Sequence, residues 1–199
     1  MTLPGALRAT TSSLSARRAL TAARVSAPVR RGTASGVSDD GGLFSGYSSE
    51  PRPLASYATL SVLFNLGFAV ALAAARRAQG GLPERVGAGD VLLIGAGTHK
   101  LSRLLAKDRV TSFLRAPFTR FQEEGGPGEV EEEARGEGMR RAVGELVICP
   151  YCLGLWVAGG FTLGLVVAPR ETRVTAAMFA ALAASDALQL LYKAGQQRA

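Results

Sequence analysis

The chain of 199 residues is poor in the residue types that most catalytic and metal sites require. Its two cysteines cannot form a disulfide framework, and a metal ion would find only Cys149, Cys152 and His99 as obvious ligands. A phosphate-binding loop and a Ser–His–acid set are both missing. The net charge is +7, yet no basic stripe interleaved with aromatic residues marks a nucleic-acid surface. We therefore predict no metal, no cofactor and no nucleic-acid partner.

Charge is also missing from long stretches of the sequence. Residues 57–75 and 146–168 contain no charged side chain, and residues 174–192 contain only Asp186. About 20 apolar residues are enough to cross a bilayer. A fourth block, residues 86–106, is interrupted by Asp90, His99, Lys100 and Arg103. The pattern predicts an all-α integral membrane bundle of about four transmembrane helices, near 57–75, 86–106, 150–168 and 174–192, in a membrane domain covering 55–195.

The N-terminal 54 residues differ from the rest. They carry seven Arg, many Ser, Thr and Ala, and no acid before Asp39. We expect a disordered basic tail. The alternatives are an organellar transit peptide, which is rich in Arg and Ser and poor in acid, or a mis-assigned start. A secretory signal peptide is not expected, because an apolar core of suitable length near Met1 is missing.

A polar connection separates the second apolar block from the third. Its first part has apolar residues at helical spacing with Arg between them, which predicts a short helix in the headgroup layer, broken or kinked at Pro117; these are Val110, Phe113, Leu114, Phe118 and Phe121. Residues 122–142 are rich in Glu and Gly, and we expect a solvated flexible loop on the cytoplasmic side. An acidic partner-binding or cation site is the alternative.

The distribution of basic residues predicts an orientation in the cell membrane. Eighteen of the 23 Lys and Arg lie in three regions. These are the N-terminal tail, residues 100–141 between the second and third blocks, and the residues after 192. Such residues accumulate on the cytoplasmic side of a membrane protein, so both termini are expected in the cytoplasm. The same arrangement places Tyr57, Tyr151 and Tyr192 at the cytoplasmic interface.

The two cysteines lie together in the segment Cys149-Pro150-Tyr151-Cys152, at the start of the third apolar block. Proline favours the first helical position, so Pro150 predicts a helix start with Cys149 at its boundary. The helix dipole there favours a thiolate. Packing thiols are the first expectation. The alternatives are a redox couple, with Cys149 attacking and Cys152 resolving, or half a metal site. On the reducing cytoplasmic side a persistent disulfide is not expected.

The tetrapeptide also matches the motif of dithiol glutaredoxins, and residues 145–148 resemble the strand that precedes it there. An apolar span follows the motif instead of an alternating strand–helix pattern. The sequence therefore argues against a glutaredoxin fold.

A polar cluster is predicted inside the membrane. The second and fourth blocks both run inwards, and His99 and Asp186 lie at similar depths along them, roughly 18–20 Å at 1.5 Å per residue. A buried carboxylate needs a partner, so we expect Asp186 to pair with Lys100, His99 or Arg103. An ion-handling role is the functional alternative to a structural ion pair. In the third block, Gly160 and Gly164 have the spacing that lets another helix approach closely.

Several of these residues resemble the bacterial domain-of-unknown-function 1360 family. The motifs occur in order over roughly residues 55–195: Gly89-Asp90, residues 98–104, Asp108, residues 114–118, residues 144–146, Cys149-Pro150-x-Cys152-x-Gly154-x-Trp156 and the late Asp186. The resemblance implies a small multi-pass membrane protein without an established activity. Some relatives in spore-forming bacteria carry a sporulation label. The tail lies outside the resemblance.

The sequence favours a non-enzymatic membrane protein that is structural or binds a partner, because no complete catalytic constellation is present. Its partners would be the lipid bilayer and either another protein or a second copy, through the glycine faces. The first alternative is a membrane thiol oxidoreductase or redox sensor that uses Cys149 and Cys152. The second is a small ion- or proton-handling protein that uses Asp186 and His99.

Overall fold

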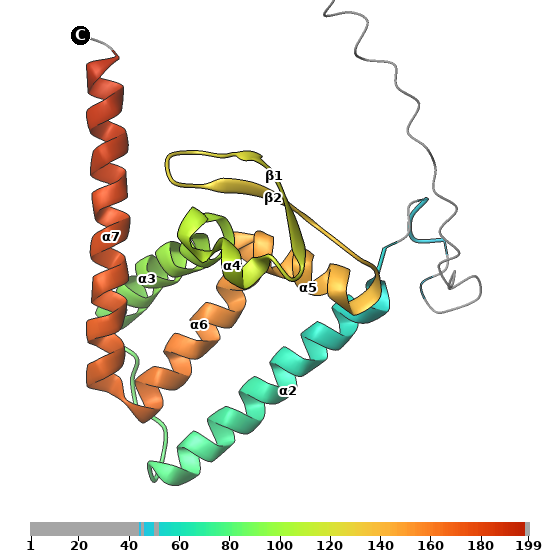
Figure 1. The fold of residues 1–199 in the computed structure, drawn as a ribbon. Helices are drawn as coiled ribbons and strands as arrows, with labels where there is room; N and C mark the ends of the chain where they lie inside the picture. The colour runs from blue at the N-terminus through green and yellow to red at the C-terminus, as the bar shows by residue number, and fades with distance from the viewer. Residues whose placement is uncertain (1–43, 45, 50–51, 198–199) are drawn as a thin grey trace, which may run out of the picture. The chain divides into compact units, whose positions relative to one another are not determined.

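The computed structural model describes residues 44, 46–49 and 52–197, and most of the predicted N-terminal tail lies outside this range. Figure 1 shows four long helices, with shorter elements joining the second to the third. The order is α2 (Leu54–Ala78), α3 (Ala88–Lys107), a 3-10 turn η1 (Arg109–Thr111), α4 (Ser112–Arg115), β1 (Thr119–Glu124), β2 (Val130–Ala134), α5 (Gly138–Ile148), α6 (Pro150–Val167) and α7 (Pro169–Gln196). The four predicted long helices are all present.

Three of the long helices, α2, α6 and α7, are long and apolar enough to cross a membrane. Helix α3 is not among them, because Asp90, Lys100, Arg103 and Lys107 interrupt its 20 residues. Helix α7 begins at Pro169, five residues before the predicted start, since proline suits the first helical position and the polar residues after it continue the helix. The described part is therefore a mainly helical chain with three candidate membrane spans.

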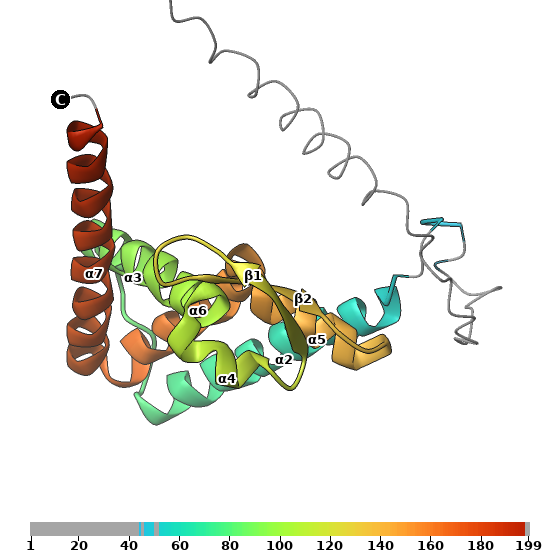
Figure 2. The same cartoon turned by 45° about the horizontal axis from the view of Figure 1, so that its top comes forward.

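Helix α6 is central to the packing, because it contacts α2, α3 and α7. Helix α3 lies against both α6 and α7, so its charged residues have neighbours on two sides. The approach of α3 to α7 is close: a Cβ added at Gly97 would lie 3.2 Å from the carbonyl oxygen of Ala176. Helix α2 packs against α5 and α6. Figure 2 shows α5 and the β1–β2 hairpin gathered near the start of α6.

The connection between α3 and α6 is folded, which corrects two predictions. Residues 122–142 were expected to form a loop, but they contribute to β1, β2 and α5. The strands pair antiparallel, Thr119 opposite Ala134, with a bulge between Phe121 and Glu123. The predicted headgroup helix over residues 110–121 is also wrong in extent, since α4 ends at Arg115 and β1 begins at Thr119. We call the segment from residue 108 to residue 148 the hairpin module.

Charge complementarity explains why the glutamates of this module are ordered. Four of the seven Glu between residues 123 and 137 form ion pairs with basic residues of α3 or of the segment after it, through the pairs Arg103–Glu129, Lys107–Glu131, Arg109–Glu124 and Arg115–Glu132. The sequence interpretation counted the acids and the bases as separate solvated groups. Their pairing across the hairpin instead holds the module on the carboxyl end of α3.

Arg115 is the centre of the hairpin module. Its side chain is 2% exposed and pairs with Glu132, which is 5% exposed. The guanidinium also donates to the carbonyl oxygens of Leu105, at 2.7 Å, and Asp108, at 3.0 Å, and to the hydroxyl of Thr111, at 2.8 Å. Carbonyls at the end of a helix have no partner within that helix. Arg115 therefore joins the last turn of α3 to the second strand.

Gly144 allows α5 to lie directly on the hairpin. A Cβ at this position would lie 2.6 Å from the carbonyl oxygen of Phe118 and 2.9 Å from the Cβ of Ala134. We expect Gly144→Ala to lower the free energy of unfolding by about 1–3 kcal/mol, because overpacking forces the backbone to shift. Thermal unfolding in a mild detergent measures this change.

Gly160 is the matched control, because nothing lies within 4 Å of a Cβ added there. Gly160→Ala is expected to be neutral or to stabilise α6 by about 0.5–1 kcal/mol, the ordinary gain of alanine over glycine in a helix. Equal unfolding temperatures for the two variants would contradict the close approach at Gly144.

Candidate functional site

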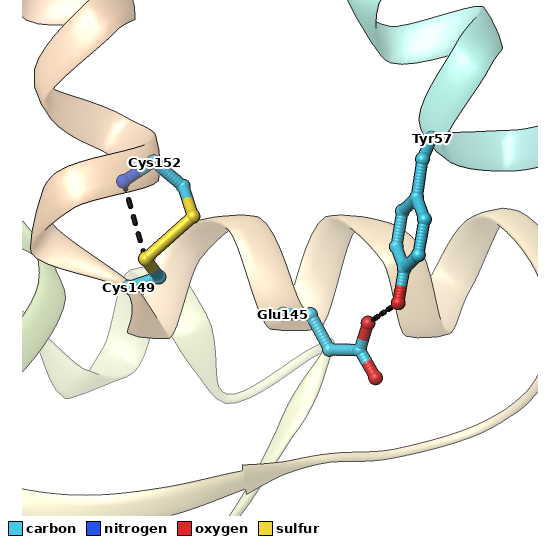
Figure 3. Close-up of a disulfide and its surroundings, with 4 residues drawn as sticks. All are labelled: Tyr57, Glu145, Cys149 and Cys152. Atoms are coloured by element: carbon cyan, nitrogen blue, oxygen red, sulfur yellow. Dashed lines mark hydrogen bonds between the residues drawn. A yellow bond between two sulfur atoms is a disulfide. The ribbon is translucent and has the colours of Figure 1, made fainter. Parts of the chain in front are cut away.

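The cysteine pair occupies the corner where α5 ends and α6 begins. Cys149 is the C-cap of α5 and the N-cap of α6, in an extended conformation with φ −102° and ψ 105°. Pro150 follows at the first position of α6, as predicted. The backbone N–H of Cys152 donates to Cys149 Sγ at 3.1 Å, and the two sulfurs form a disulfide (Figure 3).

The disulfide differs from the expectation of reduced packing thiols. The extended backbone at Cys149 points its sulfur at the first turn of α6, and the two Cα atoms are 5.3 Å apart, a separation that suits a disulfide. Cys152 is exposed, and Cys149 is half-buried. Within the described residues no cysteine remains free. The corner therefore holds an accessible sulfur pair at a helix N-terminus.

Cys152 borders an apolar groove between α2, α5 and α6. The groove has a volume of about 450 Å³, and its walls include Tyr57, Phe64, Glu145, Cys152, Leu155 and Trp156. The rings of Phe64 and Trp156 meet edge to face with centroids 5.1 Å apart. Small-molecule sites are commonly concave and apolar with a few polar groups, and this groove has that character.

A hydrogen bond crosses the polar end of the groove. The hydroxyl of Tyr57, near the start of α2, donates to the carboxylate of Glu145 on α5. Arg141 also contacts that carboxylate, at 3.0 Å. Figure 3 shows Tyr57 and Glu145 meeting beside the disulfide corner. Tyr57, Glu145 and Cys152 all line the groove, so the hydrogen-bonded pair and the disulfide belong to one site.

Sequence reasoning did not find this arrangement. It treated Tyr57 as an interfacial anchor and noted that residues 145–148 resemble a strand, whereas they form the end of α5. The only usable signal was the spacing of four between Glu145 and Cys149, which places them on one face of a helix. The partner from α2 carried no sequence signal, because the contact spans 88 residues.

The predicted polar cluster is present as a pair. Lys100 Nζ lies 2.6 Å from Asp186 Oδ2, which is one of the three pairings that the depth argument allowed. The Lys100 side chain is 17% exposed and that of Asp186 is 48% exposed. This contact joins α3 to α7.

The other two members of the predicted cluster lie elsewhere. Arg103 forms two hydrogen bonds with Glu129, at 2.7 and 2.8 Å, and so belongs to the hairpin module. His99 has an exposed side chain. Among the described residues, no group of three or more His, Cys, Asp or Glu is arranged to hold a metal ion. The predicted cluster is therefore a Lys100–Asp186 ion pair, to which neither Arg103 nor His99 belongs.

A second ion pair, missed by sequence reasoning, joins the opposite ends of the same helices. Arg173, near the start of α7, contacts Asp90, near the start of α3, at 2.7 and 2.9 Å. The Arg173 guanidinium holds the pKa of the Asp90 carboxyl below its usual range. The sequence marked Asp90 only as a charge that interrupts the second apolar block and as part of the family resemblance. Two ion pairs therefore fix the register of α3 against α7.

The predicted glycine face of α6 is used in part by the chain itself. A Cβ at Gly164 would lie 2.6 Å from the hydroxyl of Thr172 in α7, whereas Gly160 has open space beside it. Gly164 therefore lets the start of α7 pack closely against the end of α6. Gly160 is left facing outward.

Comparisons with known proteins match the part of the chain that carries most of these features. A family model described as "Protein of unknown function (DUF1360)" matches residues 93–192, which include the hairpin module, the cysteine pair and Asp186. The "Sporulation protein YjcA" of Bacillus subtilis (strain 168) is 33% identical over 86 residues, or 42% of this chain and 73% of that protein. No solved structure matches significantly. Tyr57 and Asp90 lie before the matched region.

Proposed function

The chain belongs to the DUF1360 family of proteins of unknown function, and on that premise we propose that it carries a reversible dithiol–disulfide couple at Cys149 and Cys152. The observation that supports this function is the sulfur pair at the start of α6, with Cys152 exposed beside a groove. A helix N-terminus stabilises the thiolate form of Cys149, which is the form that attacks a disulfide. The protein would then act as a membrane thiol oxidoreductase or redox sensor.

The thiol–disulfide exchange with a partner protein conserves bonds, electrons and protons. A partner protein with two thiols attacks the Cys149–Cys152 disulfide, and a mixed disulfide forms as the bond between the two cysteines breaks. The second partner thiol then attacks the mixed disulfide. The partner leaves with its own disulfide, and Cys149 and Cys152 are reduced to thiols. Two electrons and two protons pass from the partner to this chain.

The surrounding fold supports a membrane location for this couple. Helices α2, α6 and α7 have the length and composition to cross a bilayer. The basic residues favour cytoplasmic termini in the cell membrane, an arrangement in which α3 must cross as well, because two termini on one side require an even number of crossings. The cysteine corner would then face the cytoplasm, together with the hairpin module. Disulfides in that reducing compartment are mostly transient and catalytic or redox-sensing, which agrees with a reversible couple.

We expect the pair to titrate with mixtures of reduced and oxidised glutathione. The midpoint should lie between about −270 and −120 mV, the range of catalytic dithiols, whereas structural disulfides lie below about −300 mV. Mass spectrometry after trapping with a maleimide counts the free thiols at each potential. A membrane-impermeant maleimide should label the reduced pair in inverted vesicles and leave it unlabelled in intact cells.

Cys149→Ser and Cys152→Ser are the controls, because each leaves a single thiol that cannot close the ring. A pair that stays oxidised far below −300 mV, or that never forms a disulfide, contradicts the proposal. Labelling from outside intact cells contradicts the orientation alone.

A structural or partner-binding function is the second candidate, supported by the open face of α6 at Gly160. It would be the main function if Cys149 and Cys152 show no reversible thiol–disulfide exchange. An ion-handling function has less support, because Lys100 already neutralises Asp186 and His99 lies apart from them.

A further inference from the structure

The groove beside Cys152 suggests which oxidant restores the disulfide. Both α2 and α6, which form its sides, are candidate membrane spans. A molecule that enters between them therefore comes from the lipid phase. Its volume of about 450 Å³ lies within the range of 300–1,000 Å³ that small-molecule sites commonly have.

The walls of the groove combine three kinds of group. Phe64 and Trp156 provide aromatic surface against which a flat conjugated ring can stack. At the other end, Tyr57 and Glu145 form a hydrogen-bonded pair that can hold or exchange a proton. Cys152 lies in the wall with them. An acyl chain of a phospholipid would use only the aromatic part of this surface.

We propose that the groove binds a lipid-soluble quinone, which oxidises the reduced Cys149–Cys152 pair. This inference rests on the proposed function of that pair as a redox couple. A quinone has the flat ring that the aromatic wall fits and carbonyl oxygens that the polar end can protonate. It also accepts two electrons and two protons, the number that a dithiol releases on closing to a disulfide.

The step can be written with its atoms balanced. The Cys152 thiolate, which borders the groove, adds to a carbon of the quinone ring, and an S–C bond forms. The Cys149 thiolate then attacks Cys152 Sγ, so that the S–S bond forms as the S–C bond breaks. The electron pair of that S–C bond stays with the ring, which becomes a quinol. Its two oxygens receive the two protons that the thiols gave up, with Glu145 and Tyr57 placed to relay one of them.

The test follows quinol formation directly. The full chain is reduced in lipid nanodiscs, freed of reductant without oxygen, and mixed with decyl-ubiquinone. We expect one quinol, measured by its ultraviolet absorbance, for each disulfide that re-forms. Trp156→Ala is expected to slow the reaction by about tenfold or more, because removing a central aromatic side chain from a pocket is among the costliest truncations.

Phe113→Ala is the matched control, since this aromatic side chain of α4 is exposed and lies outside the groove. If the wild-type pair titrates with glutathione but decyl-ubiquinone does not oxidise it, the quinone inference fails and the proposed function stands. Equal rates for Trp156→Ala and Phe113→Ala also overturn the inference, as does quinol formation by Cys152→Ser. A pair that re-forms its disulfide with neither oxidant overturns both proposals.

Discussion

Replacing Arg115 with methionine is expected to destabilise the protein more than any other single change considered above. The substitution removes the partner of Glu132 from a site where both side chains are nearly inaccessible, at 2% and 5% exposure. Breaking a buried ion pair in this way costs about 3–5 kcal/mol, because the remaining charge stays buried without compensation. The carbonyls of Leu105 and Asp108 lose a donor at the same time. Limited proteolysis and thermal unfolding in mild detergent would measure the loss.

Two further variants make the test specific to the pair. The double change Arg115→Met with Glu132→Leu is expected to recover part of the stability, because it removes the uncompensated carboxylate as well. Arg120→Met on β1 changes an exposed arginine and should have little effect. If Arg115→Met resists protease as well as Arg120→Met does, the hairpin module does not depend on the buried pair.

Lys100→Met is expected to have the second largest effect. It leaves the carboxylate of Asp186 without the partner that lies 2.6 Å away, on a helix with the composition of a membrane span. An acidic side chain at the centre of a membrane helix costs about 2.5–3.5 kcal/mol on insertion scales. We expect a lower abundance in the membrane fraction and a lower unfolding temperature, measured by quantitative blotting and by a thermal shift in detergent.

The compensating variant is the double change Lys100→Met with Asp186→Leu, which removes both charges and should recover most of the loss. His99→Gln, at the neighbouring exposed position, is the control for a change at this level of α3. Wild-type abundance for both Lys100→Met and Asp186→Asn would show that the ion pair is dispensable.

The long helices could be predicted from the sequence, because uncharged runs of about 20 residues leave few alternatives in a membrane. The start of α6 was predictable for a local reason, since Pro150 favours the first position of a helix. Depth along two helices, which needs only the rise per residue, limited the partner of Asp186 to Lys100, His99 or Arg103. The structure selects Lys100. These predictions depend on regular geometry and on the cost of burying charge.

The hairpin module was not predictable in the same way. The glutamates between residues 123 and 137 are typical of a solvated loop when read along the chain, and their side-chain partners lie 11–26 residues away. The groove depends on the contact between α2 and α5 through Tyr57 and Glu145. No local sequence pattern predicts this contact. Polar contacts between distant segments are decided by packing, so they could not be predicted from local sequence patterns.

A single residue separates α5 from α6, and that residue is Cys149. The α5 helix carries the hairpin, through Gly144, and α6 contacts each of the other long helices. The backbone angles of Cys149 therefore act as the joint between the two halves of the described chain. While its sulfur is bonded to Cys152, the joint is clamped to the first turn of α6, and breaking that bond releases it. A chemical change in two sulfur atoms is thus applied at the residue that links α5, and the hairpin packed on it, to α6.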